Sequence, residues 1–353
     1  MKLIAQINKL VVNYKKPSDK KSFKNILVVS NSGLGDTILS TPAIISLRQS
    51  FPEVNLTFMV HQKFFPLFEG YEFVDSFLEY KSGFLAQLKI IKCLRKKKID
   101  TIFLFHSNGP EDIFFSICSG AKNILKMTDN NNHLYKHIFL NSPNLTKKHD
   151  IEKKLDLLRV FHPSLISKQM LLPQRYYPKK NSINKDQALT NIGIQLGAQD
   201  LYKIWPVDRF ICLAQMINDE CKNIKFILFG STEYERNLVK KFQLGMGVSA
   251  FIEDLCGETA IEDLPDELNK LDLLITNDTG VLHLAVALKV KTVSLFGPTN
   301  SKVFGPYQDL DLHRVIQKDG FFVNNLPKKL RSQEGMELID VDNVFNAIIE
   351  SLK

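Results

Sequence analysis

The sequence lacks several features that mark particular classes of protein. Its five cysteines are odd in number and widely spaced, with no C-x-x-C pair, which argues against a disulfide framework or a structural zinc site. No apolar run reaches the ~18 residues that a transmembrane helix needs. No apolar core with a small-residue cleavage site marks a signal peptide. These absences predict a reduced, cytoplasmic protein.

The composition is that of a globular protein, and the length of 353 residues predicts two domains of about 150 residues or more. The net charge of +8 is unevenly spread, because residues 1–24 hold seven lysines and one aspartate, a net +6. The other 329 residues share about +2. A low net charge over the body argues against nucleic acid as a partner.

The basic N-terminal segment, residues 1–24, also carries apolar residues at helical spacing. These residues are Leu3, Ile4, Ile7, Leu10 and Val11. One interpretation is a short amphipathic helix on the anionic cytoplasmic face of the inner membrane. The other is a helix packed on the body of the protein, or a frayed terminus.

Short apolar strands alternate with helical patterns in both halves, which predicts an α/β fold with two doubly wound parallel sheets. In the first half the expected strands are Asn25–Ser30, Leu56–His61 and Thr101–His106, and the helices include Pro42–Ser50 and Leu85–Lys97. In the second half the expected strands are Asn191–Gln195, Lys225–Gly230, Leu273–Thr276 and Thr292–Phe296. The expected helices there are Val207–Glu220, Tyr234–Leu244, Gly280–Leu288 and Val341–Leu352.

A polar stretch with two prolines, residues 172–187, interrupts this alternation and is predicted to link the domains. The first domain then covers residues 25–171 and the second covers residues 188–353. Ligands of doubly wound sheets bind beyond the carboxyl ends of the strands. A cleft between the two domains is therefore the expected site.

The turn "SNSGLGDT" follows the first expected strand. Gly33 and Gly35 allow a tight turn and close approach to a ligand, and a helix begins there. As a dinucleotide fingerprint the turn is incomplete, because Ile38 occupies the third glycine position. Asp36 has two interpretations: an acid that stabilises the helix start, or a carboxylate held in the cleft to accept a proton.

Two turns in the second half are typical of phosphate binding. In "QLGAQDLYKIWP", Gly197 opens a loop that leads to Lys203, whose ammonium can neutralise a phosphate. In "TNDTGVLH" a strand runs straight into a helix, so that N–H groups from Gly280 onward can bind an anion. The other polar residues of this helix start are Asp278, Thr279 and His283, each of which alone is more often a cap or a polar contact.

Two more strand ends carry candidate ligand contacts. "FGSTEYE" offers Glu233 or Glu235 to the hydroxyls of a ribose, and the sequence does not choose between them. Gly297, in "LFGPTN", is placed to line the same pocket. The D-x-D triplets at 309–311 and 340–342 are interpreted as a loop and a helix cap, so no metal site is predicted.

In this order, "GLGDTILSTPAIISLR", "KIWP" and "NDTGVLHLAVAL…VSLFGPT" resemble the heptosyltransferases of glycosyltransferase family 9, over roughly residues 25–307. The resemblance implies the GT-B fold, with two Rossmann-like domains. It also implies transfer of heptose from ADP-heptose to a lipopolysaccharide-core or other glycan acceptor, with inversion and without a metal. The nucleotide sugar is a co-substrate, so the resemblance implies no cofactor.

By motif position, Asp36 resembles the family's general base and Lys203 resembles its diphosphate-binding lysine. The residues that match the donor motif D-[ST]-G-x-x-H are Asp278, Thr279, Gly280 and His283. The chain departs from the family at 196–198, where Leu-Gly-Ala replaces the common Pro-Gly-Ala, and at Asp200, an acid close to the expected phosphate. These departures leave the preferred donor open.

Two other classes of protein fit the sequence less well than a glycosyltransferase. A dinucleotide-dependent oxidoreductase needs a fuller glycine turn and an acid after its second strand, which "LTFMVH" does not supply. A non-catalytic nucleotide-sugar-binding protein has no need of Asp36. Among enzymes, the alternative is a member of the same fold that uses a different nucleotide sugar or acceptor.

Overall fold

The computed structural model describes residues 23–106, 110–126, 148–177, 189–247, 250–320 and 331–353. The chain divides into two compact units, residues 1–173 and 174–353, and each is described by itself. The boundary falls within the stretch 172–187, of which residues 178–187 lie outside the described part. The amphipathic helix expected near the N-terminus also lies outside it and stays a prediction.

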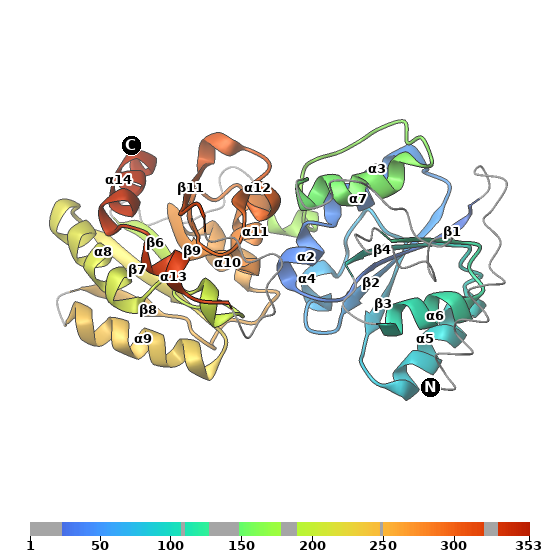
Figure 1. The fold of residues 1–353 in the computed structure, drawn as a ribbon, viewed down its shortest axis with the longest axis horizontal. Helices are drawn as coiled ribbons and strands as arrows, with labels where there is room; N and C mark the ends of the chain where they lie inside the picture. Colours follow the sequence, from blue (N-terminus) through green and yellow to red (C-terminus); the bar gives the residue numbers. More distant parts are fainter. Residues whose placement is uncertain (1–22, 107–109, 127–147, 178–188, 248–249, 321–330) are drawn as a thin grey trace. The chain divides into compact units, whose positions relative to one another are not determined.

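The first unit is a parallel sheet with strand order β3-β2-β1-β4-β5. Its strands are β1 (Asn25–Ser30), β2 (Asn55–His61), β3 (Ser76–Tyr80), β4 (Thr101–His106) and β5 (Asn123–Lys126). Its helices are α2 (Leu34–Ile38), α3 (Thr41–Ser50), α4 (Phe65–Phe68), α5 (Phe84–Lys96), α6 (Pro110–Ser119) and α7 (Asp150–Arg159). Helices α3 and α7 lie over one face of the sheet, and α5 and α6 lie over the other (Figure 1).

The second unit is a parallel sheet with strand order β11-β10-β9-β6-β7-β8. Its strands are β6 (Thr190–Gln195), β7 (Ile224–Phe229), β8 (Phe251–Asp254), β9 (Leu273–Asn277), β10 (Thr292–Phe296) and β11 (His313–Gln317). Its α-helices are α8 (Val207–Glu220), α9 (Glu233–Met246), α10 (Leu264–Asn269), α11 (Gly280–Ala287), α12 (Ser301–Phe304), α13 (Glu334–Glu337) and α14 (Val341–Leu352). Short 3-10 turns are η3 (Gln174–Tyr176), η4 (Leu201–Lys203) and η5 (Leu310–Leu312).

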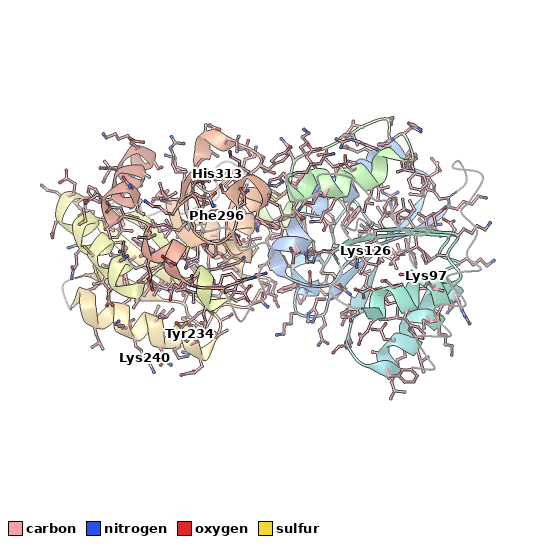
Figure 2. The ribbon with its side chains drawn as sticks, viewed as in Figure 1. Lys97, Lys126, Tyr234, Lys240, Phe296 and His313 are labelled. Carbon is pink, nitrogen blue, oxygen red and sulfur yellow. The ribbon has the colours of Figure 1, made fainter. Side chains whose placement is uncertain are left out.

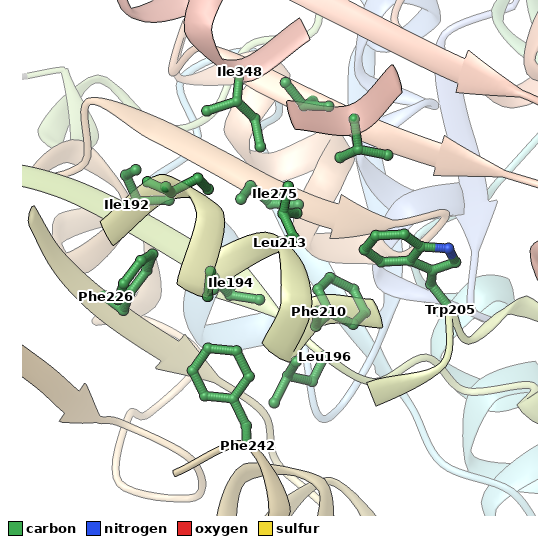
Figure 3. Packing of buried hydrophobic residues seen from close by; sticks show 14 of the residues in the cluster. Ile192, Ile194, Leu196, Trp205, Phe210, Leu213, Phe226, Phe242, Ile275 and Ile348 are labelled. Atoms are coloured by element: carbon green, nitrogen blue, oxygen red, sulfur yellow. The ribbon is translucent and has the colours of Figure 1, made fainter. Parts of the chain in front are cut away.

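The hydrophobic core of the second unit fixes the loop that follows β6. Trp205 is fully buried, and its ring meets Phe210 of α8 edge to face, with the ring centroids 4.8 Å apart (Figure 3). The indole Nε1 donates a hydrogen bond to the carbonyl oxygen of Ile339 at 3.2 Å. Because a buried tryptophan contributes a large apolar area, it anchors the backbone two residues beyond Lys203.

In each sheet, successive strands of the chain are added first on one side of the starting strand and then on the other. This reversal falls between β1 and β4 in the first unit and between β6 and β9 in the second. This strand order is that of doubly wound nucleotide-binding folds, whose ligands bind beyond the carboxyl ends of the strands at the reversal. The predicted fold class is therefore confirmed. The residues that follow these four strands are therefore the candidates for ligand binding.

Candidate active site

Asp36 lies beyond the carboxyl end of β1, at the third position of α2, with Gly33 as the N-cap and Gly35 inside the helix. Its Oδ2 accepts a hydrogen bond from the backbone N–H of Gly33 at 3.4 Å and lies 3.0 Å from Ser32 Oγ, which can donate to it. The carboxylate therefore stabilises the start of the helix. Its side chain is still 26% exposed, which leaves an oxygen accessible to a substrate hydroxyl.

His106 is a second candidate residue, and the sequence analysis did not find it. It ends β4, and the register of the sheet sets it opposite Ser30 of β1. Its Nε2 lies 3.3 Å from Asp36 Oδ1, and its Nδ1 lies 2.5 Å from Ser32 Oγ. The imidazole thus contacts both the carboxylate and the hydroxyl that binds this carboxylate.

The protonation state of His106 decides how many hydrogen bonds Asp36 receives. Burial lowers the pKa of His106, and the charge of Asp36 only partly offsets this, so the pKa stays below its usual value. A neutral ring that donates from Nε2 to Asp36 takes the Ser32 hydroxyl hydrogen at Nδ1. An imidazolium donates from both nitrogens and leaves Ser32 free to donate to Asp36. Protonation of His106 therefore adds a positive charge and one more hydrogen-bond donor next to the Asp36 carboxylate.

Other charged side chains surround His106. The cations Lys154 and Lys126 lower its pKa, and Asp150 raises it. Burial alone would raise the pKa of Asp150, but the charge and hydrogen bond of Lys154 bring it down to about 2. The pair formed by Asp150 and Lys154 is thus a fixed, ionised part of the environment of His106.

In the second unit, Lys203 and Asp278 form an ion pair, although they are far apart in sequence. Lys203 Nζ donates to Asp278 Oδ2 at 2.7 Å, and the Thr299 hydroxyl donates to the same oxygen at 2.8 Å. Burial alone would lower the pKa of Lys203, but Asp278 raises it above its usual value. The lysine is therefore charged near neutral pH, and Asp278 fixes where its ammonium lies.

The donor motif expected from the sequence coincides with the start of α11. Thr279 is the N-cap and Gly280 is the first helical residue. His283 lies on the first turn and is buried. The first N–H groups of a helix have no partner within it and carry partial positive charge. This helix start therefore supplies donors for an anion next to Asp278, the partner of Lys203.

Asn277 connects the loop after β6, which carries Lys203, to the turn after β9, which leads into α11. The sequence did not predict this role. Its Nδ2 donates to the carbonyl oxygens of Leu196 at 3.0 Å and Gly197 at 3.3 Å. Its Oδ1 accepts from the backbone N–H of Trp205 at 3.0 Å. Because Asn277 is buried and immediately precedes Asp278, it fixes the loop that carries Lys203 relative to the start of α11.

The two candidate ribose ligands differ sharply in environment. Glu235 is buried, and its Oε2 accepts from the backbone N–H groups of Ser231 and Thr232 at 2.9 and 3.0 Å. Its Oε1 accepts from Gln195 Nε2 at 2.7 Å. A Cβ at Gly197 would lie 2.4 Å from that Oε1, so only glycine fits there. The Glu235 carboxylate is thus part of a helix cap and of the packing beneath the loop.

Glu233 begins α9, and its side chain is 76% exposed, with only a long contact of 3.7 Å to Arg236. Its carboxylate is therefore the more accessible of the two. Gly297 follows β10 and packs tightly, since a Cβ there would lie 2.7 Å from the backbone of Gly335 and Met336. Packing against this backbone therefore explains why position 297 is glycine, without any contact to a ligand.

Asp200, the acid that departs from the family pattern, forms a hydrogen bond with a neighbouring side chain of the second unit. Its Oδ2 accepts from the hydroxyl of Tyr202 at 2.9 Å. The guanidinium of Arg331 donates to the same hydroxyl at 2.6 Å and lies over the tyrosine ring. The charge of Asp200 is therefore countered locally by an arginine.

Two negative findings apply to the described ranges alone. Among those residues, no three or more His, Cys, Asp or Glu side chains gather closely enough to hold a metal ion. Within the same ranges, no helix combines the length and the apolar character needed to cross a bilayer.

Two doubly wound units with polar residues at both reversal points have the architecture of the GT-B fold. A family model described as "Glycosyltransferase family 9 (heptosyltransferase)" matches residues 136–319, just over half of the chain. The chain therefore belongs to glycosyltransferase family 9. The predicted family and enzyme class are confirmed, and the oxidoreductase and the non-catalytic binding protein are set aside.

Individual relatives agree with this assignment. Lipooligosaccharide heptosyltransferase 2 of Campylobacter jejuni is 26% identical over 285 residues, which cover 78% of this chain and 82% of the relative. A solved family 9 glycosyltransferase from Veillonella parvula superposes with a TM-score of 0.75 at 20% identity, over 95% and 98% of the two chains. The E. coli ADP-heptose lps heptosyltransferase II superposes at 0.72 and 19% identity, over 93% and 98%. At these identities, the two structures show the fold alone.

Proposed function

We propose that this enzyme transfers heptose from ADP-heptose to a lipopolysaccharide-core acceptor, with inversion at the anomeric carbon and without a metal. The observation that carries the proposal is that a carboxylate follows the strands at one reversal point and an ammonium follows those at the other. One holds an accessible carboxylate, Asp36, and the other holds the ammonium of Lys203 next to the start of α11. The names of the relatives support heptose, ADP and a lipopolysaccharide acceptor.

In this proposal the first domain, residues 25–171, binds the acceptor, and the second, residues 188–353, binds the donor. Residues 172–187 link them. This division follows the chemistry, because the proton acceptor belongs with the attacking hydroxyl and the cation belongs with the diphosphate.

The reaction is a single displacement. Asp36 takes the proton of the acceptor hydroxyl while its oxygen forms a bond to the anomeric carbon. The bond from that carbon to the diphosphate breaks, and ADP leaves with the electron pair. The growing negative charge is stabilised by Lys203 and by the first N–H groups of α11. Attack opposite the leaving group inverts the anomeric centre.

A donor screen tests the proposal. We expect ADP-heptose to bind more tightly in calorimetry than UDP- or GDP-linked sugars, and NMR of the product to show inversion. Tighter binding of a UDP- or GDP-sugar would assign the chain to the alternative, a relative with another donor. A retained anomeric configuration would contradict the single displacement.

A pair of variants at His106 tests its effect on the proposed base. We expect His106→Gln, which keeps a donor towards Asp36, to lose about tenfold in kcat, and His106→Asn up to about 100-fold, because misplacing a reacting group is costly. In the wild type, kcat should fall as the pH drops through the depressed pKa of His106, because the imidazolium then holds the Asp36 carboxylate in a charged hydrogen bond. The midpoint of this acid limb should move in both variants, because His106 no longer titrates. An unchanged midpoint would remove His106 from the mechanism.

The two glutamates at the start of α9 serve as controls for each other. We propose that Glu233 binds the ribose of the donor. Glu233→Ala should weaken ADP binding in calorimetry and leave the free energy of unfolding within about 0.5 kcal/mol of wild type. Glu235→Ala should instead lower that free energy by about 1–3 kcal/mol, because it removes a cap and leaves buried donors without an acceptor. The reverse pattern would assign the ribose to Glu235.

A further inference from the structure

The first unit carries a strongly basic segment that the overall charge conceals. Residues 81–98 contain seven lysines and arginines and no acid, a net +7. Since residues 1–24 hold +6 of the total of +8, the remaining residues of the chain together carry −5. The low net charge of residues 25–353 therefore results from acids elsewhere that offset this basic segment. Positive charge is concentrated in residues 81–98.

Three of these lysines lie on one side of α5. Residues Leu85, Lys89, Lys92 and Lys96 follow one another at steps of four, three and four, so they share one stripe of the helix. All four are exposed. The opposite side of the helix faces the core through its buried residues, which are Gln87, Ile90, Ile91 and Leu94. Lys97 lies off the stripe and donates to Ser76 Oγ at 2.9 Å (Figure 2).

The first turns of the same helix expose large apolar side chains. Phe84 is 65% exposed, Leu85 is 73% exposed and Leu88 is 44% exposed. We call the side formed by these three residues with Lys89, Lys92 and Lys96 the α5 face. Exposed apolar groups of this size next to a row of lysines are the pattern of helices that lie in a bilayer interface, where the apolar groups insert and the lysines meet anionic headgroups.

We propose that the α5 face docks on an anionic phospholipid bilayer. The row of lysines complements the negative surface, and the phenylalanine and leucines give the contact an apolar component that a purely electrostatic partner such as nucleic acid does not require. A second copy of the chain is a poor occupant, because two α5 faces, each with three lysines and no acid, repel each other.

The position of the α5 face suits a lipid-linked acceptor. Helix α5 follows β3, and β3 is parallel to β1 and β4 in the same sheet. The first turn of α5 therefore lies along the same sheet edge as Asp36 and His106, which follow β1 and β4. Docking would bring this edge of the first unit to the membrane surface.

Vesicle co-sedimentation of the full chain tests the proposal. We expect binding to vesicles that contain phosphatidylglycerol, weak binding to pure phosphatidylcholine, and a steep loss of binding with added salt. Leu85→Ser with Leu88→Ser should weaken binding by about 100-fold, from about tenfold for each inserted leucine. Lys89→Gln, Lys92→Gln and Lys96→Gln together should weaken it about 100-fold, from about fivefold per lysine.

Helix α9 offers a matched control in the same chain. It exposes Tyr234 and Leu244, and Tyr234 and Lys240 are seen on it in Figure 2. Its three basic residues are offset by two acids, so its net charge is +1, whereas that of α5 is +4. Leu244→Ser with Lys240→Gln should leave vesicle binding unchanged. Equal losses in the α5 and α9 variants would overturn the proposal.

Two further outcomes would also overturn it. One is loss of vesicle binding when the lysines of residues 1–24 are replaced by glutamine, with no change in the α5 variants. The other is a dimer of the wild type, seen by sedimentation without vesicles, that the α5 substitutions dissociate. These assays read binding without turnover, so failure of the proposed reaction would leave their result intact.

Discussion

Asp36→Asn is expected to lower kcat by about 1,000-fold, within the range of about 100- to 10,000-fold for loss of a general base. The amide oxygen of asparagine can still accept from Ser32 and from the backbone N–H of Gly33, so the start of α2 should keep its hydrogen bonds. The substitution therefore separates the two roles of this residue, because it removes the proton acceptor and keeps the cap. Steady-state kinetics with saturating donor measures the loss.

Two controls make this result specific to proton transfer. The affinity for ADP, measured by calorimetry, should stay within about twofold, because Asp36 is placed with the acceptor. Ser32→Ala, which removes one hydrogen bond but keeps the carboxylate, should cost no more than about tenfold in kcat. If Asp36→Asn keeps more than a tenth of wild-type turnover, Asp36 acts only as a cap and another base is required.

Lys203→Met is expected to weaken ADP binding by about 10- to 100-fold, the value of a hydrogen bond to a charged group. It should also lower kcat by about 100-fold or more, because charge develops on the leaving diphosphate in the transition state. The substitution has a second effect, since it leaves the carboxylate of Asp278, which is 7% exposed, without its cation. We therefore expect a lower free energy of unfolding as well.

A double variant separates binding from folding at this site. In Lys203→Met with Asp278→Asn no unpaired charge stays buried, so the unfolding temperature should recover towards wild type. Affinity for ADP should not recover, because the ammonium is still absent. Recovery of wild-type affinity in the double variant would show that Lys203 acts through the structure of the loop and not through contact with the diphosphate.

The strands that the sequence revealed and those that it missed differ in one physical respect. All seven expected strands are present, and each lies in the interior of its sheet. The four strands that the sequence analysis missed, β3, β5, β8 and β11, are the outer strands of the two sheets. An outer strand has a neighbour on one side only and is partly solvated, so it carries no continuous apolar run. β8, for example, has no fully buried residue.

The candidate site divides in the same way. Asp36, Lys203 and Asp278 were found because each follows an apolar strand within a turn that carries glycine, a local pattern. His106 follows a strand just as closely, but its contact with Asp36 requires β4 to lie beside β1. The order of the strands along the chain does not show that these two are neighbours. The basic side of α5 does not show in the net charge, because acids elsewhere in the chain offset it.

The sequence by itself determined the fold class, the family and the turns that carry the chemistry, because apolar runs and glycine turns are local signals. Only the tertiary structure decided which side chains meet. It placed His106 on Asp36, paired Lys203 with Asp278 and buried Glu235 while it exposed Glu233. The physical reason is the parallel sheet, in which each crossover returns the chain to the same edge, so residues from distant turns converge at the point where the strand order reverses.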